Sequence, residues 1–255
     1  MIHKTAIISP GAQIDKNVEI GPYAIIGEGV KIGSGTVIGP HAHIACNTEI
    51  GNNNKISHSV SIGDEPQDIS FQGQPTFVRI GDGNTIREFA TIHRATKEGT
   101  ATTVGNDNYI MAYAHLGHDA QVGNRTILSN GVGIAGHVHI DDKAILSAYV
   151  VVHQFCRIGG MVMIGALTRV TQDVLPYTLV EGSPAATHGL NVIGLRRNGM
   201  SSEMRQKIKR SYKILCREKL SVENAINKIK NELEPSEEIN GLIDFVKASK
   251  RGFIR

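Results

Sequence analysis

The chemically versatile side chains of this sequence concentrate in the stretch Tyr113–Asn124, YAHLGHDAQVGN, where His115, His118 and Asp119 lie close together. A neutral imidazole, with an ordinary pKa of about 6.5, can take a proton from an attacking hydroxyl at neutral pH. Histidine is also a common metal ligand, and many histidines are simply polar surface residues. The stretch alone does not decide between these roles, so the elements that position His118 must be found first.

An apolar repeat of six residues supplies those elements. Isoleucine occupies ten successive positions of this period over residues 8–62, and the period returns over residues 80–92 and 104–170. The residue two positions earlier is small or β-branched in nearly every case, with Asn54 as an exception. Neither a helix nor a simple amphipathic strand has this period. The repeat instead predicts short strands joined by tight corners, three to a triangular coil of 18 residues, stacked as a parallel β-helix. Its glycines are expected to serve the crowded corners.

This repeat predicts a mainly β domain over residues 1–190 and an α-helical domain over residues 191–255. Two polar segments, at about 64–79 and 93–103, break the repeat and are expected to leave the β-helix as loops. The helical segment contains 15 Lys and Arg but 8 Asp and Glu, a net charge of +7, whereas the rest of the chain has a net charge of −4. Such a basic region is either a solvated face or a docking surface for an acidic partner.

The 18-residue coil places the histidines relative to one another. Residues 18 apart stack on adjacent coils, so His118, Gly136 and Gln154 form one column, and His137 stacks on Asp119. The remaining histidines of interest flank this column. His153 lies one column before it, and His93 and His115 each adjoin an inward residue and are expected to point outward.

A histidine base one coil below an open glycine suits acyl transfer. The Gly136 N–H could stabilise a developing oxyanion while His118 takes a proton from a substrate hydroxyl or amine that attacks directly. Asp119 could orient the imidazole of His118 or His137. Adjacent strand residues face opposite ways, so direct support of His118 by Asp119 requires a corner at that point.

Two other readings remain open at this level. Three clustered histidines can bind zinc, as in a metal-dependent hydratase of the β-helix carbonic anhydrase type. A purely structural β-solenoid is the other reading. The spare polar neighbours, the glycine-opened column, the loops and the basic helical domain favour acyl transfer over both.

Six motifs in this order give the sequence a family resemblance. They are PQD at 66–68, IREFATIHR at 86–94, AHLGHD at 114–119, AGHV at 135–138, VHQFCRIG at 152–159 and GLNVIGLRRNG at 189–199. With them, essentially the whole chain resembles the UDP-N-acetylglucosamine acyltransferases, which catalyse the first step of lipid A synthesis. The resemblance implies a left-handed parallel β-helix of hexapeptide repeats and a homotrimer with active sites in clefts between neighbouring prisms.

The reaction implied by the resemblance moves an (R)-3-hydroxyacyl chain from acyl carrier protein to the 3-position of the glucosamine ring of UDP-N-acetylglucosamine. A 3-amino sugar analogue is an alternative acceptor, because some family members form an amide. The resemblance implies no metal and no cofactor, since the acyl donor arrives on the phosphopantetheine of acyl carrier protein. That carrier is acidic, which would give the basic C-terminal region its partner.

The resemblance also implies roles for individual residues. His118 matches the family's general base, Asp119 its partner and Gly136 the oxyanion donor. A larger group matches positions that line the sugar or pantetheine site or meet the nucleotide: Gln67, Asp68, His93, His115, His137, His153, Asn191 and Arg197. Gln154 joins them through its place in the His118 column.

Several residues depart from the family pattern. Ser70 stands where Lys is frequent, Ile193 where an acidic residue is usual, and Asn198 where a second Arg is usual. Gly117 replaces a common Ala. Ala166 matches the residue that reads acyl-chain length, and here Gly would permit a longer chain, so Ala166 is not expected to favour the longest chains.

The remaining features concern location. The N-terminus has no basic segment followed by an apolar one, and no apolar run reaches 18 residues, so a cytoplasmic protein that does not span a membrane is expected. No nucleic-acid partner is expected. The three cysteines are far apart and fit a reducing compartment.

Overall fold

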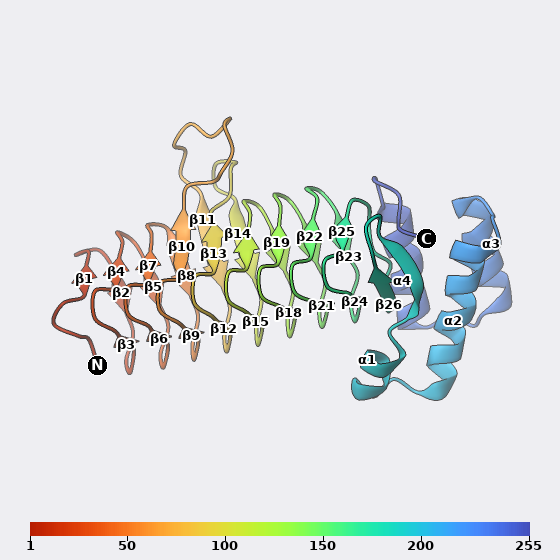
Figure 1. The fold of residues 1–255 in the computed structure, drawn as a ribbon, viewed down its shortest axis with the longest axis horizontal. Helices are drawn as coiled ribbons and strands as arrows, with labels where there is room; N and C mark the ends of the chain where they lie inside the picture. The colour runs from red at the N-terminus through yellow and green to blue at the C-terminus, as the bar shows by residue number, and fades with distance from the viewer.

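A triangular prism of stacked coils dominates the computed structural model, which describes residues 1–255 (Figure 1). Each coil contributes one short strand to each of three sheets, and all neighbouring strands pair in parallel except the last pair. The repeat of six residues is therefore one strand plus one corner. The chain runs from sheet I to sheet II to sheet III and then begins the next coil.

The strands have the following bounds. Sheet I contains β1 (Ile7–Ile8), β4 (Ile25–Ile26), β7 (His43–Ile44), β10 (Ser61–Asp64), β13 (Thr91–His93), β16 (His115–Leu116), β19 (Gly133–Ile134), β22 (Val151–Val152) and β25 (Arg169–Val170). Sheet II contains β2 (Gln13–Ile14), β5 (Lys31–Ile32), β8 (Thr48–Ile50), β11 (Phe77–Ile80), β14 (Ala101–Val104), β17 (Gln121–Val122), β20 (His139–Ile140) and β23 (Arg157–Ile158). Sheet III contains β3 (Glu19–Ile20), β6 (Val37–Ile38), β9 (Lys55–Ile56), β12 (Thr85–Ile86), β15 (Tyr109–Ile110), β18 (Ile127–Leu128), β21 (Ile145–Leu146), β24 (Met163–Ile164), β26 (Thr178–Glu181) and β27 (Ala186–Leu190).

The inward residues of the repeat fill the prism. A single cluster of 41 buried residues contains the repeat's Ile, Val and Leu residues together with the small residues two positions before them. Stacked β-branched side chains suit parallel strands that are only two residues long, because they pack against the same residue type on the coils above and below.

Each corner combines two different backbone requirements. At most corners, the residue three after the repeat's Ile, Val or Leu has positive φ, and most of these residues are not glycine: Asp119 has φ +59° and His137 has φ +59°. The glycines directly after the inward residues meet another need, close approach. A Cβ on Gly39 would lie 2.6 Å from the backbone nitrogen of His58 on the next coil. The predicted glycine corners are thus present, but crowding rather than φ requires glycine there.

Two loops leave the prism at the same corner, between sheets I and II (the I–II corner). The first spans residues 65–76, between β10 and β11, and the second spans residues 94–100, between β13 and β14. Figure 1 shows both standing off one side of the prism on neighbouring coils. Both are slightly shorter than the segments at 64–79 and 93–103 that the sequence marks, because their flanks extend the adjoining strands.

Helices cover the C-terminal end of the prism. After the antiparallel pair β26–β27 come α1 (Val192–Arg197), α2 (Ser202–Arg217), α3 (Val222–Glu232) and α4 (Glu237–Ala248). A second core of 13 buried residues joins these helices. The C-terminal tail returns to the prism, where Phe253 bridges Asp173. No helix is long and apolar enough to span a membrane.

Candidate active site

His118 lies at the I–II corner between β16 and β17, directly beside the two loops. It borders a cavity of about 420 Å³ whose wall is sheet I and whose roof comes from the first loop. The predicted site residues that line this cavity are Gln67, His93, His115, His118, Gly136 and Gln154. One chain therefore brings together residues from four separate coils and a loop.

The corner turns Asp119 toward His118. Because Asp119 has positive φ, its side chain does not point away from that of its neighbour, and Asp119 Oδ2 accepts a hydrogen bond of 2.9 Å from His118 Nδ1. Burial acts to raise the pKa of the Asp119 carboxyl, but hydrogen bonds from His118 and Thr96 outweigh it and hold the pKa below its usual range. Asp119 is thus an anion that favours the Nδ1–H tautomer of His118, in which Nε2 carries no proton.

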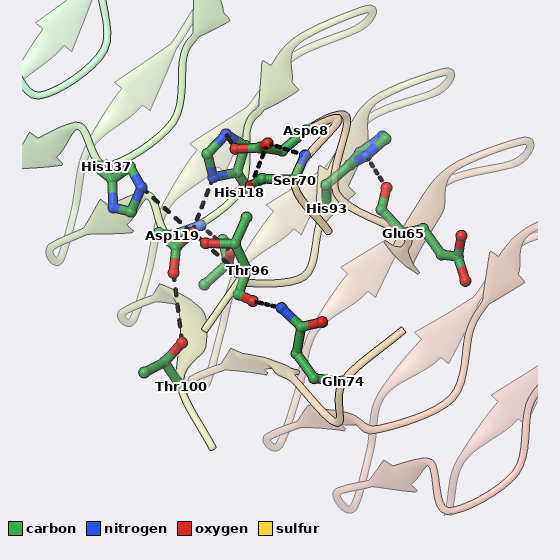
Figure 2. A network of polar contacts seen from close by, with 11 residues as sticks. Glu65, Asp68, Ser70, Gln74, His93, Thr96, Thr100, His118, Asp119 and His137 are labelled. Atoms are coloured by element: carbon green, nitrogen blue, oxygen red, sulfur yellow. Dashed lines mark hydrogen bonds and ion pairs between the residues drawn. The ribbon is translucent and has the colours of Figure 1, made fainter. Parts of the chain in front are cut away.

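The first loop places a second carboxylate at that free nitrogen. Asp68 Oδ2 lies 3.7 Å from His118 Nε2 (Figure 2). Ser70 donates to the other oxygen of Asp68 from both its hydroxyl, at 2.7 Å, and its backbone N–H, at 2.8 Å. These two hydrogen bonds lower the pKa of the Asp68 carboxyl. Ser70, one of the departures from the family pattern, therefore fixes the orientation of Asp68.

Gly136 leaves open space over His118. A Cβ built on Gly136 would lie 2.3 Å from His118 Cε1 and 2.4 Å from Nε2, so any larger residue would displace the imidazole. The Gly136 N–H donates to no protein acceptor, whereas its carbonyl accepts from Phe155. An unpaired donor beside a base is the arrangement that oxyanion stabilisation requires.

His93 and His115 lie side by side below the cavity, with ring centroids 5.2 Å apart. Both point away from the prism core, as predicted, but His93 is only 8% exposed because the first loop covers it, and its Nδ1 meets the carbonyl of Glu65. Burial, with smaller contributions from His93 and His118, lowers the pKa of His115 to about 4. Both rings thus form a desolvated floor to the cavity.

His137 and His153 lie at the edge of the site. His137 is exposed, stacks on Phe155 and approaches Asp119 Oδ2 to 3.7 Å through its Nε2. His153 is also exposed, and its Nδ1 contacts the carbonyl of Gln154 at 3.1 Å. Neither histidine lines the cavity.

Three predicted residues lie outside this region of the chain. Asn191 caps α1 by accepting from Gly194, and it also donates to the carbonyl of Met161 at the corner between sheets II and III (the II–III corner). Arg197 is exposed at the end of the same helix. Ala166 is exposed at the corner between sheets III and I (the III–I corner).

One group of side chains has the composition of a metal site. Potential ligand atoms of His118, Asp119 and His137 all lie within 4.8 Å of one another, and His153 is not among them. Asp119 Oδ2 already accepts hydrogen bonds from His118 and twice from Thr96, so an ion would have to displace these donors. The local chemistry suits a hydrogen-bonded base better than a coordination sphere.

Two residues that contact the site were missed by sequence reasoning. Thr96 donates to Asp119, and Arg94, only 8% exposed, binds the base of the first loop through Gly63 and Glu65. Both lie in or beside a segment without periodicity. Only the presence of Arg94 within a family motif could have drawn attention to it.

Comparisons with known proteins agree on one family. The chain matches the family model described as Udp N-acetylglucosamine O-acyltransferase, domain 2, over residues 173–254, and hexapeptide-repeat models over residues 29–64 and 101–136. It is 46% identical to the acyl-[acyl-carrier-protein]–UDP-N-acetylglucosamine O-acyltransferase of Thiobacillus denitrificans, covering 100% of this chain and 99% of the relative. The enzyme of the same name from Thermodesulfovibrio yellowstonii is 50% identical with the same coverage.

Solved structures lead to the same result. The UDP-N-acetylglucosamine acyltransferase of Francisella novicida superimposes with a TM-score of 0.95 at 42% identity, over 100% of this chain and 94% of the other. That of Bacteroides fragilis gives 0.96 at 41% identity over 100% of both chains. The predicted left-handed parallel β-helix of hexapeptide repeats with a C-terminal helical region is thereby confirmed.

Proposed function

The chain belongs to the UDP-N-acetylglucosamine O-acyltransferase family, and from this we propose how it transfers an acyl group from acyl carrier protein to UDP-N-acetylglucosamine in lipid A synthesis. Membership in a family of acyltransferases rules out the hydratase and structural-solenoid readings of the sequence. The observation that carries the atomic proposal is the hydrogen-bonded pair His118–Asp119 directly below the unpaired N–H of Gly136.

His118 acts as the general base. Its Nε2 takes the proton of the sugar 3-hydroxyl as that oxygen attacks the thioester carbonyl of the (R)-3-hydroxyacyl chain. Asp119 stabilises the imidazolium that forms, and the Gly136 N–H donates to the oxyanion of the tetrahedral intermediate. Collapse of that intermediate breaks the carbon–sulfur bond, and the imidazolium returns its proton to the departing phosphopantetheine thiolate.

The cavity residues hold the acceptor. Gln67 and Asp68 reach over His118 from the first loop, where amide and carboxylate groups can bind sugar hydroxyls. The floor and edges of the site, which bind the sugar or the pantetheine arm, are formed by His93, His115, His137, His153 and Gln154. No metal ion and no resident cofactor take part, since the donor carries the acyl group.

A trimer completes the site. The II–III corner carries Asn191 and the nearby Arg197, whereas His118 lies at the I–II corner. The III–I corner carries a column of exposed apolar residues, with Tyr113 65%, Tyr149 61% and Leu167 72% exposed. Three prisms that meet at this column place sheet I of one chain opposite sheet III of the next. Across that cleft, the I–II corner of one copy then faces the II–III corner of its neighbour, so nucleotide and base residues come from different chains.

The basic helical region provides a docking surface for the donor. Arg197, Lys209, Lys213 and Lys250 are exposed on a segment with a net charge of +7. Carrier proteins that present acidic surfaces associate faster with such a region, and the association weakens as salt screens it.

The test is a transfer assay with purified protein. Acyl carrier protein loaded with a 3-hydroxyacyl chain and UDP-N-acetylglucosamine should yield the 3-O-acyl product, identified by mass. His118→Ala should abolish turnover while the assembly stays folded; retention of most activity would refute the assignment of the base. A parallel reaction with the 3-amino sugar analogue compares the two acceptors, and a clear preference for the amine would overturn the hydroxyl as the natural nucleophile.

A further inference from the structure

The carboxylate of Asp119 is held by the second loop as firmly as by His118. Thr96 donates to Asp119 Oδ2 twice, from its hydroxyl at 2.7 Å and from its backbone N–H at 3.0 Å. The same oxygen accepts from His118 Nδ1 at 2.9 Å. The side chains of His118 and Asp119 are each only 12% exposed, so few water molecules can substitute for these donors.

Contacts from the first loop fix Thr96 in turn. Gln74 donates to the Thr96 carbonyl (Figure 2). The Gly99 N–H donates to the carbonyl of Pro75 at 3.0 Å. The two loops therefore form one hydrogen-bonded body beside the imidazole. Asp68 approaches Nε2 from this body, and Thr96 reaches the carboxylate behind Nδ1.

We propose that Thr96 is a positioning residue for the His118–Asp119 pair, an inference that rests on the proposed function. Its two donors fix the rotation of the Asp119 carboxylate so that one lone pair of Oδ2 points at His118 Nδ1. That contact selects the Nδ1–H tautomer, which presents the unprotonated Nε2 to the sugar hydroxyl. Without the hydroxyl, the carboxylate rotates more freely, and a larger share of His118 adopts the unproductive tautomer.

The kinetic test removes the Thr96 hydroxyl and then restores it. Thr96→Val keeps the shape and the backbone donor, and it should lower kcat about tenfold, the effect of losing one hydrogen bond to a charged group. The KM values for both substrates should stay within about twofold, and Thr96→Ser should recover most of the rate. Thr96→Ala is a second deletion of the hydroxyl, and it should match Thr96→Val. Thr103→Val is the matched control, because Thr103 lies on the outer face of sheet II and its hydroxyl makes no hydrogen bond.

A double-mutant cycle separates positioning from general stability. If Thr96 acts through Asp119, then adding Thr96→Val to Asp119→Ala should change kcat less than twofold. A full tenfold effect in that background would overturn the proposal, as would unchanged kcat in both Thr96→Val and Thr96→Ala.

Nitrogen-15 NMR of the histidine rings tests the same proposal without turnover. The share of the Nδ1–H tautomer at His118 should fall in Thr96→Val and recover in Thr96→Ser; an unchanged share would overturn the inference. Absence of acyl transfer by the unmodified protein would instead refute the proposed function, and the two failures are therefore distinguishable.

Discussion

His118 is one imidazole with two different carboxylate neighbours. Asp119 contacts Nδ1 at 2.9 Å, within hydrogen-bond distance, and Asp68 remains 3.7 Å from Nε2, too far for a direct hydrogen bond. The asymmetry leaves Nε2 available to a substrate while Nδ1 is occupied. A base with one nitrogen fixed and the other free is what proton abstraction requires.

Ala166 supports a prediction about acyl-chain length. It is exposed at the III–I corner, the deep end of the proposed cleft between prisms. Replacing it by Gly removes one methyl group from that end, so Ala166→Gly should shift the preferred acyl chain toward greater length. A panel of carrier-bound 3-hydroxyacyl chains of increasing length measures the shift, and an unchanged profile would refute the assignment of Ala166.

His115 supports a prediction about pH and stability. Its pKa is lowered to about 4 in the folded protein and is about 6.5 in an unfolded chain, so the unfolded state binds more protons between these values. Its neutral form therefore contributes stability above about pH 6.5 that is lost as pH falls toward 4.

With solvent screening of the partly exposed His115 ring taken into account, the folded protein should lose about 1–2 kcal/mol of stability as the pH falls from 6.5 toward 4. Thermal midpoints measured at pH 7.5 and 5 should fall less in His115→Gln than in the unmodified protein. An equal fall in both proteins would contradict the prediction.

The 18-residue period of the coils predicts part of the site. Stacking 18 residues apart places Gly136 over His118, and in the structure a Cβ built on Gly136 would lie 2.3 Å from that ring. The period does not predict the burial of His93 or the hydrogen bonds that Thr96 donates to Asp119. Both depend on how aperiodic loops fold back, which no repeat encodes.

At the scale of elements, a ladder of buried asparagines runs through consecutive coils. Asn84 Oδ1 accepts from the N–H and the side-chain amide of Asn108, both at 2.9 Å, and Asn84 in turn donates to Asn54 Oδ1. In the sequence, Asn54 is merely an exception to the small residues of the repeat. The period predicts where an inward side chain lies, but it does not predict that polar side chains can satisfy one another there.

The ladder leads to a stability prediction. Asn84→Ala leaves the Asn108 backbone N–H and the Gly105 carbonyl without partners and removes one of the two donors to Asn54 Oδ1, so it should destabilise the fold by about 3 kcal/mol. Asn106→Ala is the matched control, because Asn106 belongs to an exposed ladder where water replaces the lost contacts, and its cost should be below about 1 kcal/mol. Chemical denaturation of both variants checks the difference; equal losses would contradict it.

The whole molecule presents its largest exposed apolar column at the III–I corner. Phe89 and Tyr113 stack there with ring centroids 5.0 Å apart, and Tyr149 packs over Gly131 two coils further on. Stacked aromatic residues exposed along one edge of a prism are typical of a surface that another protein surface covers. Composition alone could not predict the column, since it depends on which corner each aromatic residue occupies.

The column supports a prediction about assembly. Tyr113→Glu should disperse the proposed trimer by placing three like charges near one axis, and acyl transfer should fall with it, since the proposed site draws residues from two chains. Thr103→Glu adds the same charge on the outer face of sheet II and should leave the assembly intact. Mass photometry reports the assembly state; a stable trimer of Tyr113→Glu would refute the proposed axis.

The spacing of the coils also sets the distance along the prism between His118 and Asn191. The Met161 carbonyl, which accepts a hydrogen bond from Asn191, lies at the II–III corner. Met161 stacks on Lys143 of the preceding coil, and Lys143 stacks on the II–III corner of the coil that contains His118. Asn191 therefore lies two coils further along the prism axis than His118. At about 4.8 Å per coil, this offset is about 10 Å. The number of coils between His118 and Asn191 therefore sets the length of acceptor that can reach both. A sugar joined to a nucleoside through a diphosphate can span this offset, whereas a sugar monophosphate bound at His118 ends before it reaches Asn191.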